Sequence, residues 1–552
     1  MINPLPNLFR TLQAGLIALA LPAVAQVPNT LLHSIPEPPG GVQSTDDNFG
    51  SSVALSGTRL VVGAFRDDTG GTDAGRVYVF DLIGATPTGP VLAINNPYPP
   101  PPGYSLYGFG TSLAVSSNRL VVGAFAQDQT RGAAFVYDLG GATPDVPTIV
   151  LQRPTPTVGD FFGETVAMSG PLVIAGCWGE DTGASNAGAA YVFDVGGSTP
   201  TVPLYVLPNP EPATGDQFGV SVAISGSLAV VGANSDDTGA ANAGSAYVYD
   251  LAGATPTVPL LKLANPSPDV SDVFGGAVAI EGRWVVIGAR ADDGGAIDAG
   301  TAYVYDLNSP TSALPVLTLH NPEPAAGDAF GRRVAISGTR IVVGAASDDA
   351  CANDSGSAYI YELTSSTPSV PVVSVNNPTP STSDSFGTSV AIDSTIVAIG
   401  ASGDDTTGLN QGASYIYGPH PLDQDSDGLL DSWEIAQFST TTGHGALDDS
   451  DHDGYCELLE LGFGMNPTLP SAGGLPPAID EGGFLAMTIT KQTGVTYEVQ
   501  SAGSLLPAMP DSFSPSTTTV ITNNPTTLKV RDNFLISAAP GRFMRVKVTA
   551  AP

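Results

Sequence analysis

The sequence predicts an all-β fold: a closed seven-bladed β-propeller of four-stranded blades, followed by a short acidic segment and a small β-sandwich. Three observations lead to this prediction: seven internal repeats, strands that are apolar on both faces, and a strand-like segment displaced to the N-terminal end. The chain of 552 residues is too long for one compact core, so several domains are expected. Only 13% of its residues are charged, whereas Gly (65) and Pro (48) are abundant, which indicates short strands with frequent reversals.

Two regularly spaced glycines define the repeat. Within residues 30–418 a Phe-Gly pair occurs seven times, and its last four intervals are each 56 residues. The glycines of these pairs are Gly50, Gly110, Gly163, Gly219, Gly275, Gly331 and Gly387. Thirteen residues after them come Gly63, Gly123, Gly176, Gly232, Gly288, Gly344 and Gly400. A third motif of the type GSAYVYDL follows in each copy, and this fixed spacing predicts a repeat architecture.

Each copy is interpreted as four short strands. In the fourth copy these are expected over residues 221–225, 227–233, 245–251 and 258–264. A two-residue turn, Ser225-Gly226, is expected to join the first two, and a longer Asp- and Gly-rich loop the next two. Val248 and the flanking tyrosines point to opposite sides, so the third strand is predicted to be buried on both faces.

The two ends of the repeat region predict a closed ring over residues 27–418. The seventh copy stops at Tyr417 without a fourth strand, whereas the segment 31–41 (LLHSIPEPPGG) precedes the first copy and is similar to 317–328 (LTLHNPEPAAGD). The N-terminal segment is therefore expected to supply the fourth strand of the last blade. This pairing of the two chain ends favours a closed ring over an open solenoid, whose ends do not meet. His33 and His320 are also interpreted as occupying equivalent repeat positions, which favours a structural role for both.

The Phe-Gly and Gly-Ala motifs resemble those of FG-GAP repeats, and the resemblance covers residues 30–418. This family forms the propeller of integrin α-subunits and recurs in bacterial exported proteins. The resemblance implies ligand binding or cell adhesion, and in some members calcium bound in blade loops. None of the seven copies here contains a DxDxDG-like loop within the blade, so the resemblance does not extend to blade calcium.

One face of the ring is expected to be strongly acidic, because the loops between second and third strands and the connections between blades emerge on the same side. Asp pairs such as Asp236-Asp237 recur in these loops, and an Asp such as Asp216 precedes most Phe-Gly pairs. These side chains either cap turns through nearby backbone N–H groups or attract a cation or ligand. Five residues that break the repeat are better site candidates: Glu164, Trp178, Arg290, Arg332 and Arg333. The alternative for each is an incidental surface difference between copies, so the sequence assigns no ligand-binding residue.

Residues 419–470 contain two twelve-residue loops that match an EF-hand-like calcium loop at every required position. The ligands expected in the first loop are Asp423, Asp425, Asp427, the carbonyl of Leu429, Asp431 and Glu434. Those expected in the second are Asp449, Asp451, Asp453, the carbonyl of Tyr455, Glu457 and Glu460. So many carboxylates in one loop would repel each other without a cation, so Ca²⁺ is the predicted cofactor. The segment resembles thrombospondin type 3 or dockerin-like calcium repeats, which implies a structural role.

Residues 478–552 return to alternating strands, for which a small β-sandwich is predicted. This module resembles the terminal β-modules of bacterial exported proteins, and either surface attachment or an accessory role is compatible with it. At the other end, residues 1–25 are predicted to be a signal peptide. Arg10 precedes the short apolar run 12–21, and Ala23-Val24-Ala25 offers small residues for cleavage. The mature protein is thus expected to be secreted or at the cell surface, with the periplasm as an alternative and no membrane span.

The net charge of −34 argues against nucleic-acid or anionic-lipid partners. Three cysteines are too few for a disulfide framework in a chain of this length. No GxSxG elbow, HExxH motif or zinc spacing is present, so the main expectation is a monomeric, non-enzymatic protein that binds an extracellular or cell-surface protein or glycan. The alternatives are a hydrolase acting on carbohydrate through Asp residues at the mouth of the ring, and a structural envelope component held by calcium.

Overall fold

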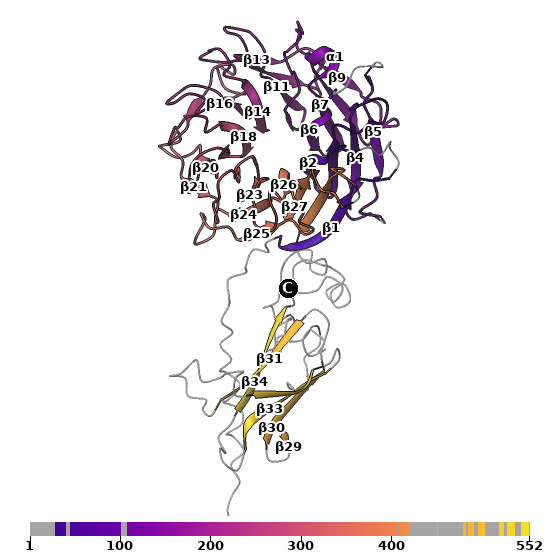
Figure 1. The fold of residues 1–552 in the computed structure, drawn as a ribbon, viewed down its shortest axis with the longest axis vertical. Helices are drawn as coiled ribbons and strands as arrows, with labels where there is room; N and C mark the ends of the chain where they lie inside the picture. The colour runs from indigo at the N-terminus through magenta and orange to yellow at the C-terminus, as the bar shows by residue number, and fades with distance from the viewer. Residues whose placement is uncertain are drawn as a thin grey trace, which may run out of the picture. The chain divides into compact units, whose positions relative to one another are not determined.

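The structure, a computed structural model, describes residues 28–39, 45–84, 86–100, 107–406 and 408–418, residues 450 and 468, and the C-terminal strands given below. Residues 28–418 form one compact unit. This unit contains seven four-stranded antiparallel sheets arranged as a ring, which confirms the predicted seven-bladed propeller (Figure 1). In each blade the first strand faces the centre of the ring and the fourth lies at the rim.

The strands recur with nearly constant lengths. Blade 1 contains β2 (Phe49–Ser56), β3 (Arg59–Ala64), β4 (Arg76–Asp81) and β5 (Leu92–Asn95). Blade 2 contains β6 (Phe109–Ser116), β7 (Arg119–Ala124), β8 (Ala133–Asp138) and β9 (Ile149–Leu151). Blade 3 contains β10 (Val166–Ser169), β11 (Leu172–Cys177), β12 (Ala189–Asp194) and β13 (Tyr205–Pro208). Blade 4 contains β14 (Phe218–Ser225), β15 (Leu228–Ala233), β16 (Ser245–Asp250) and β17 (Leu261–Ala264).

The remaining three blades follow the same order. Blade 5 contains β18 (Phe274–Glu281), β19 (Trp284–Ala289), β20 (Thr301–Asp306) and β21 (Leu317–His320). Blade 6 contains β22 (Arg333–Ser337), β23 (Arg340–Ala345), β24 (Ser357–Glu362) and β25 (Val373–Asn376). Blade 7 contains β26 (Phe386–Asp393), β27 (Ile396–Ala401), β28 (Ala413–Gly418) and β1 (Thr30–Pro36). The turn between β14 and β15 lies one residue later than predicted, at 226–227, because Ser225 still pairs with Leu228.

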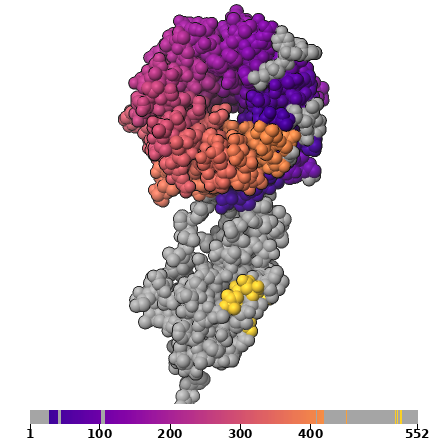
Figure 2. Space-filling view, viewed as in Figure 1, coloured from indigo at the N-terminus to yellow at the C-terminus, as the bar shows by residue number. Residues whose placement is uncertain are grey.

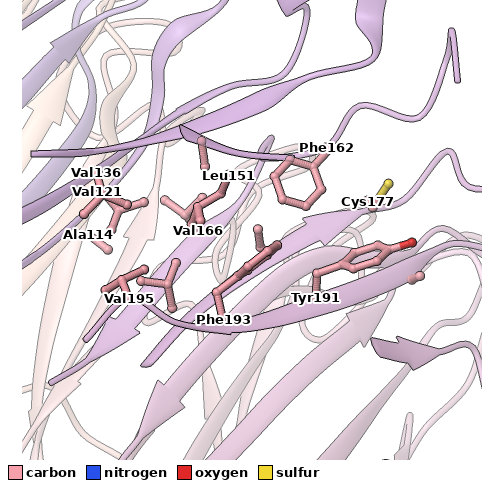
Figure 3. Close-up of a cluster of buried hydrophobic side chains, with 14 residues drawn as sticks. Ala114, Val121, Val136, Leu151, Phe162, Val166, Cys177, Tyr191, Phe193 and Val195 are labelled. Atoms are coloured by element: carbon pink, nitrogen blue, oxygen red, sulfur yellow. The ribbon is translucent and has the colours of Figure 1, made fainter. Parts of the chain in front are cut away.

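The middle strands are buried on both faces, as predicted. In β16, Tyr247, Val248 and Tyr249 are each at most 1% exposed. Their side chains enter clusters that lie between neighbouring blades, and Figure 3 shows the cluster between blades 2 and 3. There the Phe162 ring of the Phe-Gly pair packs edge-on against Phe193, with ring centroids 6.1 Å apart. The repeated aromatic residues thus hold successive sheets together rather than filling one central core.

The two glycines of the repeat are required by a close contact between blades. A Cβ atom on Gly232 would lie 2.0 Å from the carbonyl oxygen of Gly275 in the next blade. The same oxygen accepts a hydrogen bond from the Ser221 hydroxyl at 2.7 Å. Any larger residue at Gly232 would push the two blades apart, which explains why this spacing is the strongest signal in the sequence.

The ring closes by two sets of contacts between its ends. β1 pairs antiparallel with β28, so Ile35 lies opposite Ser414 and becomes fully buried. The glycine contact is also repeated here, because a Cβ on Gly400 would lie 1.9 Å from the carbonyl oxygen of Gly50. The Ser389 hydroxyl donates to that oxygen at 2.6 Å. Blade 7 therefore meets blade 1 as every other blade meets its neighbour, and the predicted closure is confirmed.

The predicted equivalence of His33 and His320 is wrong. In blade 5 His320 pairs with Thr301, the first residue of the third strand, whereas the corresponding residue of blade 7, Ala413, pairs with Pro36. The register of β1 is set by Ile35, which fills the buried position of Leu319, and the strand contains a bulge between Leu31 and His33. The first buried residue after the strand is then Glu37, at the position that Asn321 occupies in blade 5.

Beyond the propeller the structure describes six strands: β29 (Ile479–Glu481), β30 (Phe484–Thr490), β31 (Val495–Ala502), β32 (Thr518–Asn523), β33 (Thr527–Leu535) and β34 (Phe543–Ala550). They form a four-stranded sheet, β29-β30-β33-β32, and a two-stranded sheet, β31-β34. The only helical segment in the described part of the chain is α1 (Gln127–Thr130), a single irregular turn in the loop of blade 2. Among the described residues, no helix has the length and apolar character needed to cross a membrane.

Candidate functional site

The paired acidic residues of the blade loops are held by hydrogen bonds. Asp236 is 5% exposed, and its carboxylate accepts from the backbone N–H of Thr238 at 2.8 Å and from the Tyr247 hydroxyl at 3.1 Å. The next residue, Asp237, accepts from the N–H of Asn242 at 2.9 Å. Burial opposes ionisation of Asp236, but the Thr238 hydrogen bonds and the charge of Lys262 outweigh it and lower its pKa.

The same arrangement recurs around the ring. The acidic residue is bonded to a third-strand tyrosine in the pairs Asp67–Tyr78, Glu180–Tyr191, Asp292–Tyr303, Asp348–Tyr359 and Asp404–Tyr415. Each of these carboxylates therefore fixes its loop to the strand that follows. Of the two interpretations left open by the sequence, the capping of turns accounts for these residues.

The Asp residues in the connections between blades have a similar structural role. Asp216 accepts from the side-chain amide of Asn209 at 2.8 Å and from the backbone N–H of Ala213 at 2.7 Å. Burial raises the pKa of the corresponding Asp328 and Asp384 to about 6, because the hydrogen bonds to each only partly offset desolvation. The connections and the loops also meet directly, since the N–H of Ser235 donates to the carbonyl of Asp216. This contact confirms that both sets emerge on the same face.

Three of the five residues that break the repeat lie around one cavity. Arg290, Arg332 and Arg333 line a cavity of about 220 Å³, together with Val220, Asn234 and Gly276. These residues come from blades 4, 5 and 6, at the start of the inner strand or just after the second strand. They lie on one side of the central channel, on the acidic face, and Figure 2 shows a narrow opening at the centre of the ring.

The arginines of this cavity repel one another. Arg333 is exposed to solvent, and Arg332 is half-buried. Desolvation and the charges of Arg332 and Arg290 lower the pKa of Arg333 to about 10, and only Glu164 acts in the opposite direction. Desolvation and the charge of Arg290 also lower the pKa of Arg332. With a pKa of about 10, Arg333 stays positively charged at neutral pH.

The other two candidates, Glu164 and Trp178, form a pair in blade 3. The Trp178 Nε1–H donates to the Glu164 carboxylate at 2.5 Å. The indole also stacks on Phe161, with ring centroids 4.3 Å apart and an interplanar angle of 5°. Burial raises the pKa of Glu164, against the opposing effects of Trp178 and Arg333. Glu164 and Trp178 occupy in blade 3 the repeat positions of Val220 and Asn234 in blade 4, so they continue the rim of the same channel mouth.

Two features of this face were not anticipated from the sequence. Phe161 supports the indole of Trp178, and the doubled aromatic Phe161-Phe162 where other copies have one Phe is the signal that could have revealed it. Arg153 forms buried ion pairs with Asp160 at 2.6 Å and Glu180 at 3.3 Å. Aligning the repeat copies at the ends of their fourth strands would have revealed Arg153, because it stands where other blades have Asn.

The twelve predicted calcium ligands, from Asp423 to Glu460, lie outside the described residues. Within the part of the chain that is described, no group of three His, Cys, Asp or Glu side chains is arranged to hold a metal ion. Of the cysteines, Cys177 is buried and Cys351 is exposed, and both are free thiols.

Comparison with known families agrees with the geometry of the blades. The FG-GAP repeat family matches residues 42–80, 156–193, 208–249, 262–305, 317–361 and 380–417. The chain contains FG-GAP repeats. The six matched stretches fall in blades 1 and 3 to 7, and blade 2, whose loop has Gln127 in place of the acidic residue, lies between matched stretches. No curated protein matched the chain.

Proposed function

We propose that the protein is an exported, non-enzymatic binding or adhesion protein that recognises a macromolecule through the acidic face of its FG-GAP propeller. The observation that carries this proposal is the gathering of repeat-breaking residues at the channel mouth. Repeated residues on this face are engaged in hydrogen bonds that hold the blades. Glu164, Trp178, Arg290, Arg332 and Arg333 have no such repeated role, yet they lie on the same face, on blades 3, 5 and 6.

The rest of the chain supports a location outside the cytoplasm. The N-terminal sequence has the features of an export signal, and the two calcium-loop sequences suit extracellular calcium, with a Kd on the order of 0.1–1 mM. The calcium loops would stiffen the segment that joins the propeller to the C-terminal strands. A hydrolase remains the second reading from the sequence, but the loop carboxylates of the ring are bonded to tyrosines and backbone N–H groups, which supports binding rather than catalysis.

A binding screen tests the proposal directly. The full-length protein is incubated with a glycan array and with cell-envelope extracts. Each incubation is done in about 2 mM calcium, which is above the expected Kd, and again after the calcium is chelated. We expect saturable binding that the double variant Arg332→Ala/Arg333→Ala weakens and that the exposed-site control Arg131→Ala leaves unchanged. Turnover of a bound glycan, abolished by a single Asp or Glu substitution, would replace this proposal with the hydrolase.

The calcium part is tested separately by titration calorimetry. We expect two sites with Kd values of roughly 0.1–1 mM, one of which is lost in Glu434→Gln and the other in Glu460→Gln, because this Glu is the bidentate ligand of each loop. The control Asp145→Asn, an exposed carboxylate in the propeller, should bind calcium as the parent chain does. Full binding in both loop variants would show that these loops do not hold the ion.

A further inference from the structure

The arginine cavity is a cationic site on a strongly acidic protein. The chain has 19 Lys and Arg residues against 53 Asp and Glu, yet three arginines line a single cavity. In the described part of the chain, none of these three forms an ion pair, whereas Arg131, Arg153, Arg283 and Arg340 do. A planar guanidinium group matches the two oxygens of a carboxylate, so an anionic group in this cavity would relieve the mutual repulsion of the arginines.

The surroundings of the cavity limit how much negative charge a ligand can carry. Carboxylates such as Asp236, Asp292 and Asp348 lie in loops on the same face, and each accepts a hydrogen bond from its tyrosine. A polyanion laid across this face would meet these charges in every direction outside the cavity. The geometry therefore favours a ligand with one anionic group and an otherwise neutral body.

The aromatic side of the channel mouth suits a saccharide ring. Trp178 and Phe161 form a flat half-buried stack in blade 3, next to the position of Asn234 at the cavity wall. Glu164 accepts a hydrogen bond from Trp178 with one carboxylate oxygen and has acceptor capacity left for a hydroxyl group. A flat apolar surface beside a few convergent polar groups is the usual composition of a small-ligand site.

We propose that the mouth of the propeller channel binds a sugar acid, with its carboxylate held by Arg290, Arg332 and Arg333 and its ring directed towards Trp178, Glu164 and Asn234. This inference rests on the proposed binding function and names the ligand class of the same face. The carboxylated sugar would be a terminal or isolated unit of a largely neutral glycan, because the acidic loops disfavour a chain of such units.

The test is a titration of the full-length protein with small probes, followed by ligand-observed NMR. The probes are methyl glucuronoside, neutral methyl glucoside, methyl glucoside 6-sulfate, acetate and polygalacturonate. We expect the glucuronoside to bind at least tenfold more tightly than the glucoside or acetate. The 6-sulfate and polygalacturonate, the latter counted per sugar unit, should both bind more weakly than the glucuronoside.

Single substitutions locate the site. Arg290→Ala and Arg332→Ala should each weaken glucuronoside binding at least tenfold, and Arg332→Lys should recover only part of the loss because it removes the forked donor. Trp178→Ala should reduce the glucuronoside to the affinity of acetate. Arg131→Ala is the matched control, since its side chain pairs with Asp128 in the loop of blade 2, and unchanged thermal unfolding of each variant shows that the fold is intact.

Several results would overturn the inference. Equal binding of glucoside and glucuronoside removes the role of the carboxylate, and tighter binding of the 6-sulfate assigns the cavity to sulfate instead. Equal binding of acetate and glucuronoside would show that the sugar ring does not contribute to affinity. Unchanged binding in the arginine variants would show that the ligand does not bind in this cavity. If the glycan and envelope screen shows binding that these arginine variants retain, the binding function stands and only the sugar-acid site fails. If the screen is blank while the glucuronoside binds, the macromolecular function fails and the site stands.

Discussion

The segment that follows the fourth strand carries three different chemical groups at one structural position. In blades 3 to 6 it is Asn, and Asn209, Asn265, Asn321 and Asn377 each donate to the Asp seven residues later, at 2.6 to 2.8 Å. After blade 2 it is Arg153, which pairs with Asp160 and reaches Glu180. At the closure of the ring it is Glu37, which hydrogen bonds to Asp47.

These three cases show that one position of the repeat can hold a neutral, a positively charged or an acidic side chain. The neutral amide of Asn satisfies a buried carboxylate without adding charge, whereas Arg153 neutralises two carboxylates at the cost of its own desolvation. Glu37 has no such compensation. Burial, followed by the charges of Asp47 and Asp67, raises its pKa to about 9, and Arg76 offsets only part of this. The closing blade is therefore held by a carboxylic acid that must keep its proton.

The largest expected effect comes from removing the cation after blade 2. Arg153→Leu leaves Asp160 and Glu180 buried without a partner, and we expect a loss of about 3–5 kcal/mol in the free energy of unfolding. Urea unfolding followed by tryptophan fluorescence measures this. The exposed pair Arg131–Asp128, whose side chains are 30% and 59% exposed, provides the control, and Arg131→Leu should change stability by less than about 1 kcal/mol. Equal losses in the two variants would show that burial does not distinguish the two pairs.

The next effect is a gain in stability at the ring closure. The folded state holds a proton on Glu37 that the unfolded chain releases above its ordinary pKa of 4.5. Stability from this residue is therefore complete below pH 4.5 and declines as the pH rises towards about 9. Glu37→Gln carries no titrating group, so at about pH 8 it should unfold with a free energy roughly 2–4 kcal/mol higher than the parent.

The pH dependence of that gain separates it from a general effect of removing charge. At about pH 4 the parent Glu37 is protonated in both states, so parent and Glu37→Gln should unfold at nearly the same urea concentration. Glu323→Gln, an exposed carboxylate in a blade connection, should show little change at either pH. A gain for Glu37→Gln that is as large at pH 4 as at pH 8, or a loss at pH 8, contradicts the assigned protonation state.

The repeat, the blade count and the ring closure could be predicted from the sequence because they depend on local sterics. The glycine spacing reflects the contact of Gly232 with the carbonyl of Gly275, and no other residue fits there. The register of β1 could not be predicted in the same way. The Pro-Glu-Pro shared by segments 31–41 and 317–328 places Glu37 opposite Glu323 in sequence, but burial of Ile35 against its neighbours sets the pairing two residues away.

The candidate site was only partly visible in the sequence. Each repeat-breaking residue could be recognised by comparison with the other copies, and Arg290, Arg332 and Arg333 were all found this way. Their convergence on one cavity depends on how neighbouring blades are placed about the channel, which no single copy encodes. Arg153 and Glu37 were missed because their partners, Asp160 and Asp47, belong to the next blade.

The smallest expected effect concerns the hydrogen bond between a third-strand tyrosine and a loop carboxylate, which recurs in most blades. Two tyrosines of β16 provide a matched pair, since both are at most 1% exposed. The Tyr247 hydroxyl donates to Asp236, whereas the buried Tyr249 hydroxyl has no hydrogen-bond partner. Tyr247→Phe should lose about 1 kcal/mol in urea unfolding, and Tyr249→Phe should be neutral or slightly stabilising because it removes an unsatisfied polar atom. If both substitutions cost the same, the tyrosine–carboxylate bond contributes nothing beyond packing, and the loops of the ring would have to be fixed by their backbone hydrogen bonds alone.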